Sequence, residues 1–286
     1  MREISLWDLL DPSRCSPAAF VGAGGKSAAL ARAAGEARER GVGVFLSVTT
    51  RLALRQADIA DRTVFLRSAG AYETVPPPAS APAPASGESV LVAEAPLPEV
   101  EKISGVPPDY ICNLAAAHPG TPVFVEADGA AEAHLKVPGP QEPAVPSCSR
   151  LVAAVTGFPA FGALVSQARI HRRERLSALA GAPQRVDPAL IGMLLAHREG
   201  CFKGAPAGAR RIWLINQADT HSQMLQAREF AEAALAALTE VVAAGTPPAA
   251  AASRGARIEA GELRDPKIDA VVVGSLASGV LMQVSG

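Results

Sequence analysis

A glycine-rich segment early in the chain contains the residues best suited to chemistry. It follows an apolar run at residues 18–21 and leads into an alanine-rich helical pattern that extends to Arg40. The backbone N–H groups of such a turn converge on phosphate oxygens when no side chains block the approach, and the helix N-terminus adds positive potential. The lysine then reaches the β- and γ-phosphates, and the serine hydroxyl ligates Mg²⁺. We therefore expect Mg²⁺ with ATP or GTP to bind at Gly22, Ala23, Gly24, Gly25, Lys26 and Ser27.

This loop is shorter than a full Walker A motif, because Phe20 occupies the position of the first glycine. The remaining pattern, G-x-x-G-K-S, resembles the phosphate loop of Mur-type ligases and related nucleotide-binding proteins. A dinucleotide-binding fingerprint fits less well, since it needs glycine or alanine where Ser27 stands. The structural alternative is a tight strand-to-helix turn that carries an exposed lysine. The position between a buried strand and a helix favours the phosphate site.

Two acidic residues end a second apolar segment, residues 123–129. Phosphoryl chemistry needs an anchor for Mg²⁺, usually a carboxylate at the end of a neighbouring strand. Because side chains alternate along a strand, Glu126 and Asp128 point to the same side. We expect Asp128, with Ser27, to hold the metal ion while Glu126 orients a nucleophile; the reverse assignment and a solvated strand end remain open. Lys26, Glu126 and Asp128 are the predicted catalytic groups.

Two further groups of polar residues are less specific. Thr49 and Thr50 follow the apolar run 42–48 and would offer a hydroxyl to Mg²⁺ or the γ-phosphate, although threonine is common in strands for structural reasons. His171 lies in a basic cluster at residues 170–174 that could contact phosphate or a partner. The other histidines have no metal-ligand spacing and are expected to be ordinary surface or core residues.

Residues 213–219, which include L-I-N-Q-A-D, are close to the N-K-x-D element of GTP-binding proteins. In that element the asparagine shapes the base pocket, and the aspartate accepts two hydrogen bonds that guanine can donate and adenine cannot. Asn216 and Asp219 are therefore predicted base-pocket residues. Gln217 stands where a lysine would stack on the base. Asp219 or Thr220 could instead cap the following helix.

The elements that must position these residues alternate between strands and helices. This alternation predicts an α/β fold with a mainly parallel, doubly wound sheet, like that of P-loop NTPases. We treat residues 1–286 as a single nucleotide-binding α/β domain with a Pro/Ala-rich surface loop at about 75–89. A second proline-rich stretch, 137–146, lies near the predicted site, and 247–252 is expected to be a loop. Strands are expected at residues 18–21, 42–48, 63–66, 90–93, 122–127, 151–156, 211–215, 241–243 and 270–273, and helices at 4–10, 27–40, 108–117, 187–197 and 220–238.

The composition narrows the classes of protein. The net charge is −1 with both signs interspersed, which indicates neither a nucleic-acid partner nor an anionic membrane surface. No run of about 20 apolar residues is present, and the first residues lack the basic start of a signal peptide, so we expect a cytoplasmic protein with no membrane contact. The cysteines form no C-x-x-C pair and are expected to be reduced thiols. They are Cys15, Cys112, Cys148 and Cys201.

Taken together, the segments resemble the selenium-dependent hydroxylase accessory proteins, the YqeC-like family. The match covers, in order, V-G-A-G-G-K-S, S-V-T-T-R, K-I-S-G-V, V-E-A-D-G-A, L-K-V-P, Q-E-P-A-V-P, I-H-R, G-C-F-K-G-A-P and L-I-N-Q-A-D. The acidic strand end with its L-K-x-P and E-P-x-x-P continuation is the most specific part. The resemblance implies a cytoplasmic nucleotide-binding protein that assists maturation of molybdenum hydroxylases, with a molybdenum-cofactor enzyme or its maturation factors as partner. It also gives weight to Glu142 and to Lys136, which we expect to face the nucleotide or a second substrate; a lysine in an exposed loop is the alternative.

Three functions fit this pattern. The leading one is an NTPase or NTP-dependent switch that drives a step in metal-cofactor enzyme assembly. The second is a binding protein for which the nucleotide is only a structural or regulatory ligand. The third is a small-molecule kinase or ligase, favoured by the Mur-like loop and by Lys136 and Glu142 as groups for a second substrate.

Overall fold

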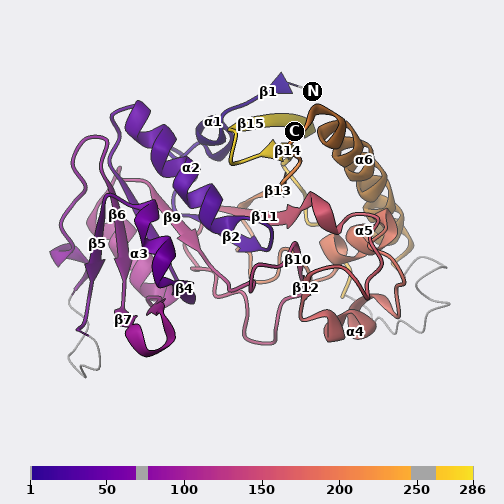
Figure 1. Ribbon diagram of the computed structural model, residues 1–286, viewed down its shortest axis with the longest axis horizontal. Helices are drawn as coiled ribbons and strands as arrows, with labels where there is room; N and C mark the ends of the chain where they lie inside the picture. Colours follow the sequence, from indigo (N-terminus) through magenta and orange to yellow (C-terminus); the bar gives the residue numbers. More distant parts are fainter. Residues whose placement is uncertain (1, 69–76, 246–261, 286) are drawn as a thin grey trace.

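A ten-stranded sheet runs through the middle of the molecule in the computed structural model, which describes residues 2–68, 77–245 and 262–285. The strand order is β1-β15-β14-β13-β11-β2-β9-β3-β6-β5 (Figure 1). All neighbours from β14 to β5 are parallel, whereas β15 and β1 are antiparallel additions at one edge. The expected α/β fold with a mainly parallel sheet is confirmed. The strands are β1 (Arg2–Glu3), β2 (Ala18–Gly22), β3 (Val44–Val48), β5 (Arg62–Phe65), β6 (Ser89–Ala93), β9 (Val123–Glu126), β11 (Leu151–Gly157), β13 (Arg210–Asn216), β14 (Ala270–Ser275) and β15 (Val280–Ser285).

Helices cover both faces of this sheet. Helices α1 (Leu6–Leu10) and α2 (Lys26–Glu39) pack on one face, where Phe20 of β2 points. On the opposite face, where Ala19 points, lie α3 (Pro108–Ala117), α4 (Leu176–Ala180), α5 (Pro188–Ala196) and α6 (His221–Ala244). Because adjacent residues of β2 enter different cores, the sheet is buried on both sides, as its continuous apolar strands predict.

Strand β2 lies at the point of the sheet where the strand order changes direction. After β2, the chain builds β3, β5, β6 and β9 on one side, with β9 returning next to β2. It then crosses to β11 on the other side of β2 and continues outward to β13 and β14. In open α/β sheets, ligands bind beyond the carboxyl ends of the strands at such a switch point. The glycine loop that follows β2 is therefore at the favoured place.

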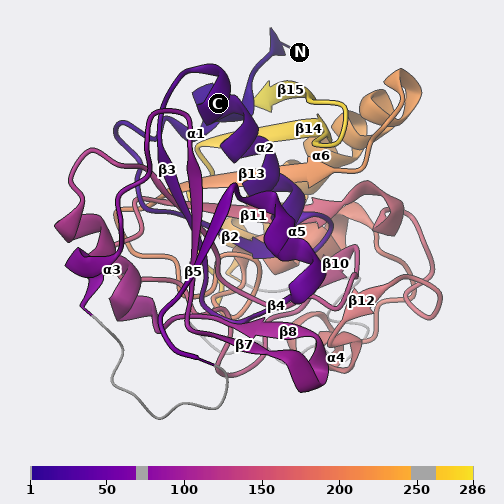
Figure 2. The ribbon, with the colours of Figure 1, turned by 60° about the vertical axis from the view of Figure 1, so that its left-hand side comes forward.

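Two small sheets stand beyond the carboxyl ends of the main strands (Figure 2). One is antiparallel and consists of β4 (Arg51–Ala53), β8 (Lys102–Ser104) and β7 (Ala95–Leu97). The other is a short parallel pair, β10 (Leu135–Lys136) with β12 (Ile170–His171). Since β4 begins directly after the Thr49-Thr50 pair, the first small sheet is connected to the end of β3.

The predicted strand at residues 241–243 is wrong, because these residues form the last turns of α6. The helix begins with a capping box between Thr220 and Gln223, continues with Leu238 and Val241 buried at helical spacing, and ends at Gly245 in the left-handed conformation. An apolar pair of valines next to alanines fits either structure, and the buried helical face decides. Among the described residues, no helix is both long and apolar enough to span a bilayer.

The Pro/Ala-rich segment is shorter than expected, since β6 already begins at Ser89. Residues 77–88 contain one short 3₁₀ turn, Pro78–Ser80, and are otherwise irregular, as the proline content predicts. The beginning of the expected loop, residues 75–76, and the alanine-rich segment 247–252 lie outside the described residues.

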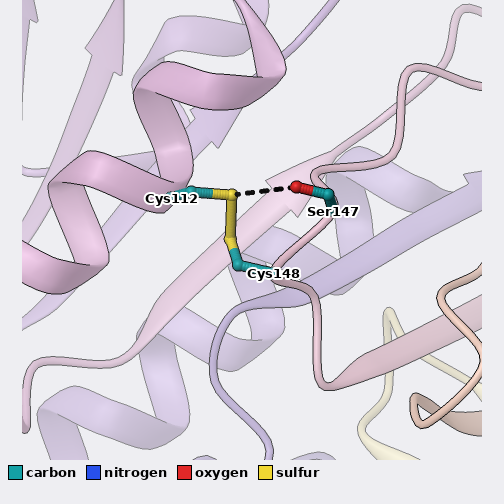
Figure 3. The surroundings of a disulfide bond; sticks show 3 residues. All are labelled: Cys112, Ser147 and Cys148. Atoms are coloured by element: carbon teal, nitrogen blue, oxygen red, sulfur yellow. Dashed lines mark hydrogen bonds between the residues drawn. A yellow bond between two sulfur atoms is a disulfide. The ribbon is translucent and has the colours of Figure 1, made fainter.

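A disulfide corrects the expectation of four reduced thiols. Cys112 of α3 is bonded to Cys148, whose Cα atom lies 5.6 Å away, and Cys112 Sγ also contacts the hydroxyl of Ser147 (Figure 3). The two residues are 36 positions apart, and only the packing of α3 beside the segment before β11 brings them together. Cys15 and Cys201 are free thiols.

Candidate functional site

The glycine loop is held tightly against the ends of two neighbouring strands. Gly22, Gly24 and Gly25 all have positive φ angles, at 90°, 94° and 124°. A Cβ atom at Gly22 or Gly24 would collide with the backbone at the end of β11, and one at Gly25 would collide with the Asn216 amide. Glycine is therefore required here both by conformation and by space.

The backbone of this loop presents amide donors at the start of α2. The N–H of Gly22 donates to Asp128 Oδ2 (2.9 Å), and the N–H of Ala23 donates to the carbonyl of Val155 (2.9 Å). In contrast, the N–H groups of Gly24, Gly25 and Lys26 have no acceptor among the described residues, and no side chain caps the helix. Free donors at a helix N-terminus form an anion-binding site.

Lys26 lies at the centre of a buried charge cluster. Its ammonium nitrogen is 3.1 Å from Asp128 Oδ1 and 3.7 Å from Glu126 Oε1, and it donates to the carbonyl of Gly22 (2.7 Å). Burial alone would lower the pKa of Lys26, but the Asp128 and Glu126 carboxylates raise it above its ordinary value. The lysine therefore carries a positive charge next to the loop.

Ser27 and Glu126 form a pair of oxygen groups on the pocket side of this cluster. The Ser27 hydroxyl donates to Glu126 Oε2 (2.7 Å) and accepts from Gln56 Nε2 (3.2 Å). Burial raises the pKa of Glu126 above its usual range, although Lys26 and the Ser27 hydrogen bond oppose this shift. A hydroxyl and a carboxylate oxygen are the hard ligands that Mg²⁺ prefers, so this pair fits the implied metal ion.

Asp128 lies deeper than expected and shares its charge with a second lysine. Its carboxylate is 1% exposed and contacts Lys26, the Gly22 N–H and Lys136 Nζ (3.2 Å). Lys136 is itself 3% exposed, and its ammonium also contacts Glu142 Oε2 (2.9 Å). Lys136 was expected to face the nucleotide or a second substrate; instead its ammonium is enclosed between two carboxylates behind the pocket wall.

The other predicted residues separate into those on the pocket wall and those behind it. Thr50 lines the pocket, whereas the Thr49 hydroxyl donates to the carbonyl of Ala144 (2.8 Å). Asn216 is buried and ties the loop to the next strand end, since its Nδ2 donates to the Gly24 carbonyl (2.7 Å) and its Oδ1 accepts from the N–H of Leu276 (2.9 Å). Asp219 is exposed and does not line this pocket, and Thr220 caps α6, as the alternative interpretation had it.

The loop opens onto a pocket of about 1000 Å³. Its walls include many residues that sequence reasoning did not select, mainly from the two small sheets and the turn after β9. The only signal for them was that some lie in the segments S-V-T-T-R, K-I-S-G-V and I-H-R. The polar side chains found only in the structure are Arg51, Arg55, Gln56, Lys102, Glu132, His134 and Arg169. Arg172, from the basic cluster at residues 170–174, and Gln217, from the segment L-I-N-Q-A-D, also line the pocket.

The fold is that of a doubly wound α/β protein, and the switch point of its sheet holds a glycine loop with free amide donors, a buried lysine and two carboxylates. The chain belongs to the YqeC family: the family model described as "YqeC protein" matches residues 18–174. A curated relative from Escherichia coli (strain K12), "Uncharacterized protein YqeC", is 34% identical over 118 residues, which are 41% of this chain and 46% of the relative. The chain thus spans about half the length of the relative it matches. No solved structure matches the chain. The resemblance noted in the sequence is confirmed at the level of the family.

Proposed function

We propose that this chain is a Mg²⁺-dependent nucleoside-triphosphate-binding protein that hydrolyses its nucleotide. The observation that carries the proposal is the loop at Gly22 to Ser27, whose free N–H groups lie beside Lys26 and beside the hydroxyl–carboxylate pair of Ser27 and Glu126. Backbone donors, one ammonium and a metal-binding pair are the minimum set for holding β- and γ-phosphates. If this loop were only a structural turn between a strand and a helix, the buried charges of Lys26, Glu126 and Asp128 would have no explanation.

Each group of the site has a separate role in this proposal. The loop amides would bind the phosphate oxygens, and Lys26 would neutralise charge between the β- and γ-phosphates. Ser27 and Glu126 would hold Mg²⁺, which when bound neutralises the charge that develops on the phosphate oxygens. Glu126 lines the pocket and Asp128 does not, so Glu126 takes the metal role first assigned to Asp128. Asp128 would position the loop through the Gly22 N–H and Lys26.

Membership of the family also supports a proposal for the biological role. We propose that nucleotide binding serves an accessory step in the maturation of molybdenum hydroxylases, with a molybdenum-cofactor enzyme or its maturation factors as the partner. Membership of the YqeC family supports an accessory role of this kind. The nucleotide is ATP or GTP, and the exposed position of Asp219 outside the pocket gives no preference for guanine.

Titration calorimetry with ATP and GTP, with and without Mg²⁺, tests the binding site. We expect Lys26→Ala to weaken binding by at least about tenfold, the factor that corresponds to 1.4 kcal/mol. Ser27→Ala should remove most of the Mg²⁺ dependence while keeping the fold, because it deletes only one half-buried hydroxyl. Lys267→Ala, at an exposed position outside the pocket, is the matched control. Full nucleotide affinity in both Lys26→Ala and Ser27→Ala would overturn the proposal.

Phosphate release separates hydrolysis from simple binding. Glu126→Gln keeps the shape of the side chain and the possibility of a bond to Ser27, but removes the charge. If turnover depends on the metal pair, this variant should lose phosphate release while it still binds nucleotide. Equal turnover in wild type and Glu126→Gln would contradict the assignment of Glu126. The Asp219→Ala variant, measured with both nucleotides, decides whether this residue contributes to base selection.

A further inference from the structure

The pocket carries more positive charge than the rest of the molecule. Its walls hold six lysine or arginine side chains and three glutamates, whereas the whole chain has a net charge of −1. The basic side chains are Lys26, Arg51, Arg55, Lys102, Arg169 and Arg172. Concave sites with one sign of charge concentrate ligands of the opposite sign.

Most of this charge lies outside the loop itself, on two walls formed by different elements. Arg51 and Lys102 come from the antiparallel small sheet, in which Lys102 pairs with Ala53. Arg169 and Arg172 flank β12 and form the second wall. The first wall reaches the loop at Ser27, because Gln56 Nε2, beside Arg55, donates to the Ser27 hydroxyl (3.2 Å). This wall therefore lies beside the hydroxyl–carboxylate pair of Ser27 and Glu126.

Neither predicted base-pocket residue contributes to these walls. Asn216 is used to tie the loop, and Asp219 is absent from the pocket walls. A volume of about 1000 Å³ is at the upper end of the range for small-molecule sites. The pocket therefore has room for a second small molecule beside a nucleotide bound at the loop.

The charges on the two walls differ in how far they are already neutralised. Arg172 contacts Glu142 with two nitrogens, at 3.1 and 3.2 Å, and Arg55 and Arg169 pair with Glu132. Within the described ranges, neither Arg51 nor Lys102 has an ion-pair partner, and both are exposed to the pocket. Unpaired cations inside a concave site are available for a ligand.

The backbone of these walls is also unusual. Seven described residues other than glycine have positive φ, and four of them line the pocket: Ala131, Glu132, Arg172 and Gln217. Such conformations are strained and concentrate where a ligand is held. At Arg172, the strained backbone and the packing of the guanidinium against Gly139 fix the side chain on the wall.

We propose that the pocket binds a second ligand beside the nucleotide, a small molecule that carries a phosphate group, with Arg51 and Lys102 as its principal contacts. The inference rests on the proposed function, because it places this ligand next to the γ-phosphate. A small molecule, rather than a nucleic acid, fits a concave site in a chain whose overall charge is nearly balanced. The site is thus built for two anionic ligands at once.

The test uses inorganic phosphate as the probe. The protein is first saturated with Mg²⁺ and a non-hydrolysable triphosphate analogue, and phosphate binding is then followed by phosphorus NMR. The double variant Arg51→Gln/Lys102→Gln should bind phosphate about tenfold more weakly than wild type, with analogue affinity unchanged within about twofold. The control is Arg228→Gln/Lys267→Gln, which removes the same two charge types from exposed positions outside the pocket.

Two results would overturn the second site. One is unchanged phosphate binding in Arg51→Gln/Lys102→Gln. The other is an equal loss of analogue and phosphate affinity, which would assign both side chains to the triphosphate. If wild type binds no analogue, the proposed function fails instead. Phosphate is then titrated into the protein alone: weaker binding by the double variant would still support an anion site on this wall, and equal binding would overturn it.

Discussion

Lys136 provides a second cation for Asp128. The Asp128 carboxylate lies 3.1 Å from Lys26 and 3.2 Å from Lys136, and a buried carboxylate that loses its partner is strongly destabilising. With both lysines present, the pairing of Asp128 does not depend on Lys26 alone. Lys26 is then free to contact phosphate without leaving an unpaired charge in the core. This arrangement gives Lys136 a positioning role, which explains why it is enclosed.

Glu142 connects this network to the pocket wall, and its titration is testable. Burial would raise its pKa, but hydrogen bonds from Arg172 and Lys136 lower it from an ordinary 4.5 to about 2. Because the folded pKa is depressed, the pairing stabilises the fold fully above pH 4.5 and loses its contribution as the pH falls toward 2. The shift of about 2.5 pKa units would correspond to about 3.4 kcal/mol at about 1.4 kcal/mol per unit. Because the pair is partly exposed, solvent screening reduces this value, and we expect Glu142→Gln to lower the free energy of unfolding by roughly 2 kcal/mol at neutral pH.

The measurement is denaturant unfolding of wild type and Glu142→Gln across this pH range. The difference between them should be constant at neutral pH and should shrink below pH 4.5. Glu240→Gln, on the exposed side of α6, sets the baseline for loss of one carboxylate. A difference that stays constant down to low pH would show that the pairing does not stabilise the fold.

The chemistry-bearing residues could be found from sequence only where a motif names them. Lys26, Ser27 and Glu126 were selected because glycine spacing and a strand end imply their roles, and the structure places them in contact. Arg51 and Lys102 have no local signal, because an exposed basic residue in a short strand is ordinary. Only the pairing of β4 with β8 brings them to one wall. The sequence also could not show that Lys136 is enclosed, because this depends on the folded chain bringing Glu142 into contact with its ammonium group.

Glycine has opposite effects in the loop and in the helix that follows it, which allows a matched comparison. Gly24 has φ of 94°, and a Cβ there would press on the backbone of Gly157. Gly35, inside α2, has no atom within 4 Å of an added Cβ. Gly24→Ala should therefore destabilise the protein by roughly 1–3 kcal/mol and weaken nucleotide binding. Gly35→Ala should stabilise it by about 1 kcal/mol through helix propensity.

The stabilities of Gly24→Ala and Gly35→Ala are measured by denaturant unfolding, and their nucleotide affinities by titration calorimetry. A Gly24→Ala protein as stable as wild type would mean that the loop can relax away from β11. A loss of nucleotide affinity in Gly35→Ala would mean that α2 transmits changes to the loop, which its packing does not suggest.

Secondary structure was predictable where periodicity and end signals agreed. The strand–loop–helix–strand unit from β2 to β3 combines a buried run, glycines and a good helix terminator, and it forms as expected. The prediction of a strand at residues 241–243 was wrong because an apolar run this short shows neither the helical nor the strand periodicity. The two small sheets were missed because strands of two or three residues are defined by their partners.

At the scale of the whole molecule, β2 separates β9, β3, β6 and β5 from β11, β13 and β14, and a disulfide links segments from the two sides. Cys112 lies in α3, just before β9, and Cys148 lies three residues before β11. Both are near the start of the strands, whereas the pocket lies beyond the strand ends. Sequence spacing predicts the parallel sheet but not this bond, since the chain must fold before the two thiols meet.

The disulfide should therefore stabilise the fold without shaping the pocket. It closes a segment of 36 residues, and cross-links of this kind contribute about 2–4 kcal/mol, mainly by restricting the unfolded chain. Cys112→Ser/Cys148→Ser should lower the free energy of unfolding by that amount, whereas Cys15→Ser, which removes a free thiol, should change it little. Nucleotide affinity of the double variant should remain within about twofold of wild type, less than the tenfold that 1.4 kcal/mol produces. Unchanged stability with lost affinity would mean that the bond acts on the site through the 137–150 segment, which carries Glu142 and the Ala144 carbonyl bonded to Thr49.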